Sequence, residues 1–159
     1  VETYLFLIMK TNMKFKLKVI DKMIAEKERA LEDVYTSQRM RLDQTKKDDI
    51  DNMRYESKNE EVLHQLDLLN NNVEFIEKEL LQIRNIPIDL EMDKVQPGSL
   101  VETDKAIMLV GAAHEEMNVD GVEVVGISMA APIYEKMQDL RQGDDFELNG
   151  RKYHIKRIV

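Results

Sequence analysis

The fold is decided by residues 62–83, which read VLHQLDLLNNNVEFIEKELLQI. Apolar residues recur there at alternating steps of four and three positions, the a/d spacing of a coiled-coil seam. Polar and charged residues fill most of the other positions. The seam consists of Val62, Leu66, Leu69, Val73, Ile76, Leu80 and Ile83. This stretch therefore predicts a long amphipathic helix that needs a partner for its apolar stripe.

A second, less regular seam precedes it, and Lys27 and Gln38 interrupt its register. Residues 43–51 (DQTKKDDID) separate the two seams and hold one apolar residue, so we interpret them as the tip of an antiparallel helical hairpin. Such a hairpin would be a monomer. The alternative is a dimer that buries residues 62–83 between two chains. The members of the second seam are Leu17, Ile20, Ile24, Leu31, Val34 and Leu42.

Every glycine and proline of the chain comes after this helical half, beginning with Pro87. Because these residues break helices and build turns, the second half predicts a small sheet domain. Asn149-Gly150 is the typical pair of a two-residue hairpin turn. We expect about five strands and one short helix, including strands at 100–103, 106–110 and 122–127, a helix at 132–140, and strands on both sides of the turn.

The predicted fold class is therefore α+β, with an N-terminal antiparallel coiled-coil hairpin and a β-rich C-terminal domain. The hairpin is expected over 1–86, a linker over 87–97 and the C-terminal domain over 98–159. We interpret residues 1–12 as a disordered or non-native extension, since their apolar run is too short for a signal sequence or a membrane span.

Composition excludes several classes of function. The formal net charge is −8, and the segment from Pro87 onward has 14 acidic against 8 basic side chains. Such a domain is a poor non-specific DNA binder, because neutralising phosphates requires Lys and Arg. The absence of cysteine rules out disulfides and thiolate chemistry and fits a reducing cytosol. We expect a cytoplasmic protein with no membrane partner.

Carboxylates cluster at the predicted tip. Asp48 and Asp51 would share one face of a helix, and Asp49 adds a third acid. Carboxylate oxygens are the ligands that Mg²⁺ prefers, although two of them bind it weakly without further ligands from a partner. The same spacing fits a helix start with Asp48 as the N-cap, and on spacing alone this capping interpretation is favoured.

Short motifs follow in order along both halves. In sequence they are the tip Asp48-Asp49-Ile50-Asp51-Asn52-Met53-Arg54-Tyr55, then Gly98-Ser99-Leu100-Val101, Val110-Gly111, Ile127-Ser128 with Pro132, and Gly143-Asp144. Together they resemble the bacterial Gre-type transcript cleavage factors, GreA and GreB, over roughly residues 14–159. The resemblance identifies a divergent member and implies that the C-terminal domain is FKBP-like.

The resemblance also implies a function. Such factors bind RNA polymerase, insert the coiled-coil tip into its secondary channel and stimulate cleavage of backtracked nascent RNA in the elongation complex. They are not enzymes alone and hold no cofactor tightly, because the polymerase supplies the Mg²⁺. By resemblance, Asp48 and Asp51 would be the catalytic, metal-directed acids. The binding residues would be Asp49, Asn52, Tyr55, Ser128 and Pro132.

Three departures from the family pattern leave alternatives open. Met53 and Arg54 replace a small residue and an acid, Asp51 is shorter than the usual glutamate, and residues 112–120 look like an insertion. A secondary-channel regulator that does not stimulate cleavage is one alternative, and a structural coiled-coil module is another. A prolyl isomerase is disfavoured, because the C-terminal half has few aromatic residues to line a pocket.

A run of lysines lies at the start of the first predicted helix. It could face nucleic acid or the rim of the polymerase, but a solvated helix face is the more usual explanation. The run comprises Lys10, Lys14, Lys16, Lys18 and Lys22.

Overall fold

The computed structural model describes residues 12–48 and 56–159. These residues form two compact units. The hairpin unit is Ala25–Leu81, and the sheet unit combines the residues up to Ile24 with Gln82–Val159. The domain bounds expected from the sequence remain a prediction.

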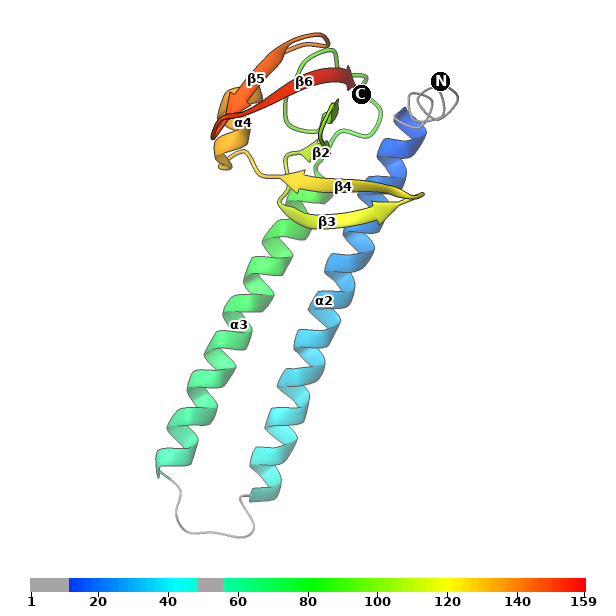
Figure 1. The fold of residues 1–159 in the computed structure, drawn as a ribbon. Helices are drawn as coiled ribbons and strands as arrows, with labels where there is room; N and C mark the ends of the chain where they lie inside the picture. The colour runs from blue at the N-terminus through cyan, green and yellow to red at the C-terminus, as the bar shows by residue number, and fades with distance from the viewer. Residues whose placement is uncertain (1–11, 49–55) are drawn as a thin grey trace. The chain divides into compact units, whose positions relative to one another are not determined.

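Two long helices, α2 (Met13–Asp48) and α3 (Glu56–Arg84), account for most of the N-terminal half (Figure 1). Neither helix contains glycine or proline, so nothing in their sequence interrupts the backbone hydrogen bonds. Asn12 caps α2, because its side-chain Oδ1 accepts a hydrogen bond from the backbone N–H of Phe15 at 2.9 Å. Arg84 lies in the last turn of α3, where a cation suits the negative end of the helix dipole.

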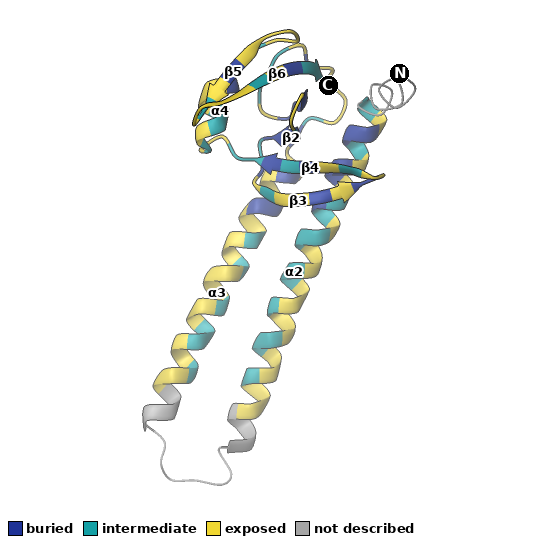
Figure 2. Ribbon diagram, in the orientation of Figure 1, coloured by how far each residue is buried: buried dark blue, intermediate teal, exposed yellow. Residues whose placement is uncertain are grey.

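In the hairpin unit the two helices pair antiparallel along their seams. The seam of α3 is half-buried from Val62 to Ile76 and buried at Leu80, while most positions between are exposed (Figure 2). On α2, Leu31 is half-buried in the same way. The predicted hairpin is therefore confirmed. Leu42 departs from its predicted place in the seam, since 45 % of it is exposed.

The sheet unit holds a six-stranded mixed sheet in the order β3-β4-β2-β1-β6-β5. β2 and β4 run parallel, and every other neighbouring pair is antiparallel. A short helix, α4 (Pro132–Met137), lies between β4 and β5 along the chain, so the predicted α+β class is confirmed. The strands are β1 (Leu100–Thr103), β2 (Ile107–Val110), β3 (His114–Val119), β4 (Val122–Ile127), β5 (Asp145–Leu148) and β6 (Arg151–Ile158).

Apolar side chains cover both faces of this sheet, which explains why β1 and β2 are buried at every position. Successive residues of a strand point to opposite faces. Leu109 joins a core cluster with the first turns of α2, whereas Met108 and Val110 join a second cluster with Met137 of α4. From α2 the first cluster takes Phe15, Val19, Ile20 and Met23.

The structure differs from the predicted elements in two places. Residues 114–119, part of the stretch interpreted as an insertion, form β3, so the sheet has six strands rather than about five. α4 ends at Met137 instead of extending to 140. Asp139 takes a φ of 61°, and its N–H donates to the carbonyl of Val95 at 2.8 Å, so a contact outside the helix ends it early.

The predicted turn at Asn149-Gly150 is confirmed. It joins β5 to β6, and both residues have positive φ, 52° and 76°, as a type I′ turn requires. Across this hairpin Phe146 and Tyr153 stand opposite each other with their rings stacked 4.8 Å apart. Phe146 is buried, so these aromatic residues support the core.

Candidate functional site

Residues 43–48 of the predicted tip belong to α2 in the hairpin unit, and its remaining residues, 49–51, lie outside the described residues. Asp48 is the last residue of α2. Asp49, Asp51, Asn52 and Tyr55 lie outside the described residues. The roles expected of these five residues therefore stay predictions, and the described part of the site is the scaffold that carries them.

The described part of α2 extends to Asp48, and the residues from 49 to 55 lie outside the described residues. Both interpretations of Asp48, as a metal ligand and as a helix N-cap, therefore stay predictions.

Two polar residues interrupt the seam of α2, and both have partners on α3. Lys27 Nζ lies 2.5 Å from Glu79 Oε2, with the two side chains 18 % and 10 % exposed. Gln38 Nε2 donates to Asn70 Oδ1 at 2.8 Å. Polar residues in an apolar seam fix the register, since a shift would leave them without partners. The interruptions that make the first seam look irregular therefore specify how the two arms pair.

Two further pairs connect the arms. The Tyr35 hydroxyl donates to Glu77 Oε1 at 3.1 Å, and this hydrogen bond to a carboxylate raises the pKa of the phenol. Arg41 donates to the side-chain carbonyl of Gln65. Over these four pairs the residue number rises along α2 while that of the partner falls along α3, as antiparallel pairing requires. The pair between Arg41 and Gln65 is the one nearest the predicted tip among the printed pairs.

Ser128 and Pro132, the predicted binding residues outside the tip, lie in the sheet unit on the connection from β4 to α4. Ser128 is half-buried, and its carbonyl accepts a hydrogen bond from the N–H of Ala131 at 3.1 Å. Pro132 is exposed and begins α4, where its missing N–H costs nothing. The structure thus brings these two residues together across one turn. Their predicted contact with a partner is untested.

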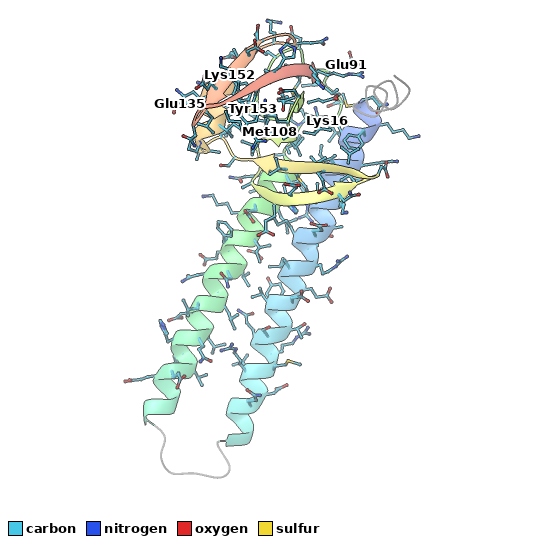
Figure 3. The ribbon with its side chains drawn as sticks, in the orientation of Figure 1. Lys16, Glu91, Met108, Glu135, Lys152 and Tyr153 are labelled. Atoms are coloured by element: carbon cyan, nitrogen blue, oxygen red, sulfur yellow. The ribbon has the colours of Figure 1, made fainter. Side chains whose placement is uncertain are left out.

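Three of the lysines at the start of α2 make contacts with other residues of the sheet unit. Lys16 is buried and donates to the backbone carbonyl of Val159 (Figure 3). Lys18 lies 2.7 Å from Asp120, and Lys22 donates to the carbonyl of Asn118. Lys16 therefore does not belong to the solvated or nucleic-acid-facing helix surface expected from the sequence, whereas Lys18 has half of its side chain exposed and stays on it. Lys14 is exposed, and Lys10 lies outside the described residues.

A signal for this packing was present in the sequence. Phe15, Val19 and Met23 recur every four residues on a helical face and are all buried against the sheet. The a/d register assigned to the first arm does not include these positions, so the sequence analysis did not predict that they pack against the sheet.

Within residues 12–48 and 56–159, no group of three or more His, Cys, Asp or Glu side chains is placed to hold a metal ion. No helix among these residues is long and apolar enough to cross a membrane.

Two solved structures are similar to this chain in fold. GreA factor homolog 1 (Gfh1) of Thermus thermophilus shares 15 % identity, with 88 % of this chain and 92 % of that chain covered and a TM-score of 0.34. Gfh1 of Thermus aquaticus shares 14 % identity, with 91 % and 94 % covered and a TM-score of 0.35. No model of a known protein family matches the chain, and no curated protein matches it.

Proposed function

We propose that this chain binds bacterial RNA polymerase, places its hairpin tip in the secondary channel and stimulates cleavage of backtracked RNA. One observation carries the proposal. A helical hairpin with acids at its predicted tip is joined to a small mixed sheet, and the Gre-type motifs follow on these elements in their family order. A factor acting inside the bacterial polymerase would work in the cytoplasm.

The glycines of these motifs have physical roles in the sheet unit, which supports the resemblance. Gly98 and Gly111 have φ of 94° and 120°, in the region that favours glycine. The N–H of Gly98 donates to the carbonyl of Val110 at 2.7 Å. A Cβ on Gly111 would lie 3.4 Å from the backbone nitrogen of Gly98. The motif that begins at Gly98 and the motif that ends at Gly111 therefore lie side by side where β1 begins and β2 ends. The pairing of these two strands fixes their position relative to each other.

The chemistry of the tip fits a metal shared with a partner. Asp48 and Asp51 offer carboxylate oxygens, the donors that Mg²⁺ prefers, but two donors cannot complete its octahedral shell. The remaining ligands would come from the polymerase. In phosphodiester hydrolysis a bound Mg²⁺ stabilises developing charge and activates water. The chain would contribute the placement of its carboxylates and would not hydrolyse RNA alone.

The test is RNA cleavage in a backtracked elongation complex of the cognate polymerase. We expect the wild-type chain to stimulate cleavage and Asp48→Ala/Asp51→Ala to abolish the stimulation without weakening polymerase binding. Asp33→Ala is the matched control, since it removes an exposed carboxylate of α2 outside the predicted tip. Equal stimulation by the double variant and the wild type would refute the roles of these acids.

A second candidate is a secondary-channel regulator that does not stimulate cleavage. Met53 and Arg54 favour it, because they stand where the family motif has a small residue and an acid. This candidate predicts no cleavage by the wild type, together with competition against a known secondary-channel binder. A chain that neither stimulates nor competes would return the protein to the class of structural coiled-coil modules.

A further inference from the structure

Each arm of the hairpin unit interrupts its helix-favouring sequence at one place. On α2, residues 25–44 contain Ser, Thr or Asn only at Thr36 and Ser37. On α3, residues 60–81 contain them only in the run Asn70-Asn71-Asn72. The side chains of these three residue types compete with the helix for backbone hydrogen bonds and lower its stability.

The two interruptions lie at the same level of the hairpin. Gln38, which follows Ser37, donates a hydrogen bond from Nε2 to Oδ1 of Asn70 at 2.8 Å. Residues 36–38 and 70–72 therefore lie opposite each other, and we refer to them as the polar layer. A weak point in one arm alone would be held straight by the other helix, whereas two weak points side by side let both helices bend together.

Local hydrogen bonding on α2 also weakens the helix at the polar layer. The Ser37 hydroxyl donates to the backbone carbonyl oxygen of Asp33, four residues earlier, at 3.0 Å. This bond uses the acceptor of a helix hydrogen bond, and such back-bonding favours bending. On α3, Asn71 and Asn72 are exposed, so packing does not offset their low helix propensity.

Packing around the polar layer is sparse. In the part of the hairpin that the structure describes, no residue from 25 to 44 or from 60 to 78 is buried (Figure 2). The seam next to the layer is apolar and half-buried at Val34, Leu69 and Val73, whereas the layer itself is joined by the Gln38–Asn70 hydrogen bond. Water can replace this exposed bond, so it fixes the register but adds little stability.

We propose that the polar layer is a hinge of the hairpin. The two helices open there together, and residues 39–44 with 60–69 move as one piece relative to residues 25–35 with 73–81. The Gln38–Asn70 hydrogen bond keeps the arms in register while they bend. Such a hinge gives the end of the hairpin a lateral freedom that two uninterrupted helices lack. The inference concerns the hairpin alone and does not depend on the proposed function.

Two matched variants of the full chain test the hinge. The layer variant, Ser37→Ala/Asn71→Ala/Asn72→Ala, removes the competing side chains and keeps the Gln38–Asn70 hydrogen bond. The control variant, Arg29→Ala/Glu74→Ala/Lys78→Ala, changes three exposed residues of the same helices outside the layer, where the native residues are already good helix formers. Both variants should fold, because none of the six side chains is buried.

Amide hydrogen exchange measures opening at the layer. In the wild type we expect the amides of residues 36–40 and 70–74 to exchange faster than those of residues 29–34 and 62–66. The layer variant should slow exchange at the layer about tenfold, because each of its three substitutions removes a small helix penalty, and the control variant by less than about twofold.

Distances between two spin labels measure the bend directly. The chain has no cysteine, so Ala25→Cys/Gln44→Cys supplies two labelling sites, both exposed and on opposite sides of the layer in α2. A straight helix would hold these positions about 28 Å apart along its axis. Pulsed electron paramagnetic resonance should give a broad distribution that extends to shorter distances in the wild type and the control variant, and a narrow one in the layer variant.

Three results would overturn the hinge. Exchange that quickens steadily toward residues 44 and 60, with no maximum at the layer, would mean that the arms fray from their ends. A narrow distance distribution in the wild type would mean that α2 does not bend, and equal effects of the two variants would mean that the layer is not special. Fastest exchange at the layer, with narrowing in the layer variant alone, supports it. Because these measurements use the chain alone, a negative result leaves the proposed function standing.

Discussion

The side-chain amine of Lys16 donates a hydrogen bond to the backbone carbonyl oxygen of Val159 at 3.2 Å, joining positions 143 residues apart. The same carbonyl accepts the N–H of Leu100 at 2.9 Å, at the place where β1 meets the end of the chain after β6. Lys16 is 0 % exposed and Val159 is 7 % exposed. Burial lowers the pKa of the Lys16 amine from its ordinary value of 10.5, because the charged form loses hydration.

This burial predicts how stability depends on pH. Between the lowered folded pKa and 10.5, the unfolded chain binds more protons at Lys16 than the folded chain does. The contribution of Lys16 to the free energy of unfolding should therefore be largest above 10.5 and be lost as pH falls through the folded pKa. Urea unfolding at pH values from 7 to 10.5 should show this alkaline gain.

Lys16→Met tests the assignment, because it keeps the buried stem and removes the amine. We expect the alkaline gain from this position to disappear and the stability at pH 7 to change by no more than about 1 kcal/mol, since an apolar side chain often replaces a buried charge without loss. Lys14→Met, at an exposed neighbouring position, is the control. An unchanged pH profile in Lys16→Met would show that burial of this amine does not contribute to it.

Sequence reasoning worked where one local pattern decides the structure. The seam of α3 keeps a strict a/d spacing, and its residues in the hairpin unit are half-buried from Val62 to Ile76 and buried at Leu80. Asn149-Gly150 adopts the two positive φ values that its residue types favour. Both predictions depend on neighbours in sequence, so no distant contact was needed to make them.

Sequence reasoning failed where contacts between residues distant in sequence determine the structure. β3 has buried side chains only at Met117 and Val119, which is too few for a recognisable strand. Contacts made by Lys18 and Lys22 of α2 with Asp120 and Asn118 help hold this edge of the sheet. For the candidate site, the tip acids came from the resemblance and not from spacing, since spacing favoured a cap.

The Lys27–Glu79 pair predicts a difference between single and double substitutions. Lys27→Ala leaves Glu79 in a partly buried position without its cation and should lower the free energy of unfolding by about 2 kcal/mol. Lys27→Met/Glu79→Met should recover most of this loss, because it restores apolar packing in the seam. Urea unfolding of Lys27→Met, Glu79→Met and the double variant, followed at 222 nm, gives the double-mutant cycle. Additive effects in the cycle would mean that the two side chains are not coupled.

α4 lacks a side-chain cap, and this suggests a stabilising substitution. Ala131 occupies the N-cap position with φ −70° and ψ 137°, and its side chain makes no capping hydrogen bond. Ala131→Ser adds a side-chain acceptor within reach of the N–H groups of the first turn and should raise stability by about 1 kcal/mol. Differential scanning calorimetry should show a higher Tm. Ala130→Ser, one residue earlier, should leave Tm unchanged, and an equal rise in both variants would exclude capping as the cause.

At Gly126 the backbone of residues 112 and 114 lies too close to leave room for a methyl group, so an added Cβ there should be strongly destabilising. Gly126 stands opposite His114, next to a shift in strand register. A Cβ at this position would meet the backbone nitrogen of His114 at 2.6 Å and would also press on the carbonyl oxygen of Ala112. Backbone atoms cannot move aside as a flexible side chain can, so Gly126→Ala should cost about 3 kcal/mol.

Gly143 provides the comparison that separates crowding from backbone strain at Gly126. A Cβ on Gly143 has nothing within 4 Å, but its φ of 93° strains any other residue. Gly143→Ala should therefore lower stability by about 1 kcal/mol through strain alone. Hydrogen exchange of the β3 and β4 amides should accelerate in Gly126→Ala and stay near wild type in Gly143→Ala. If both variants lose the same stability and the β3 amides stay protected, close approach of the strands is not what requires glycine at 126.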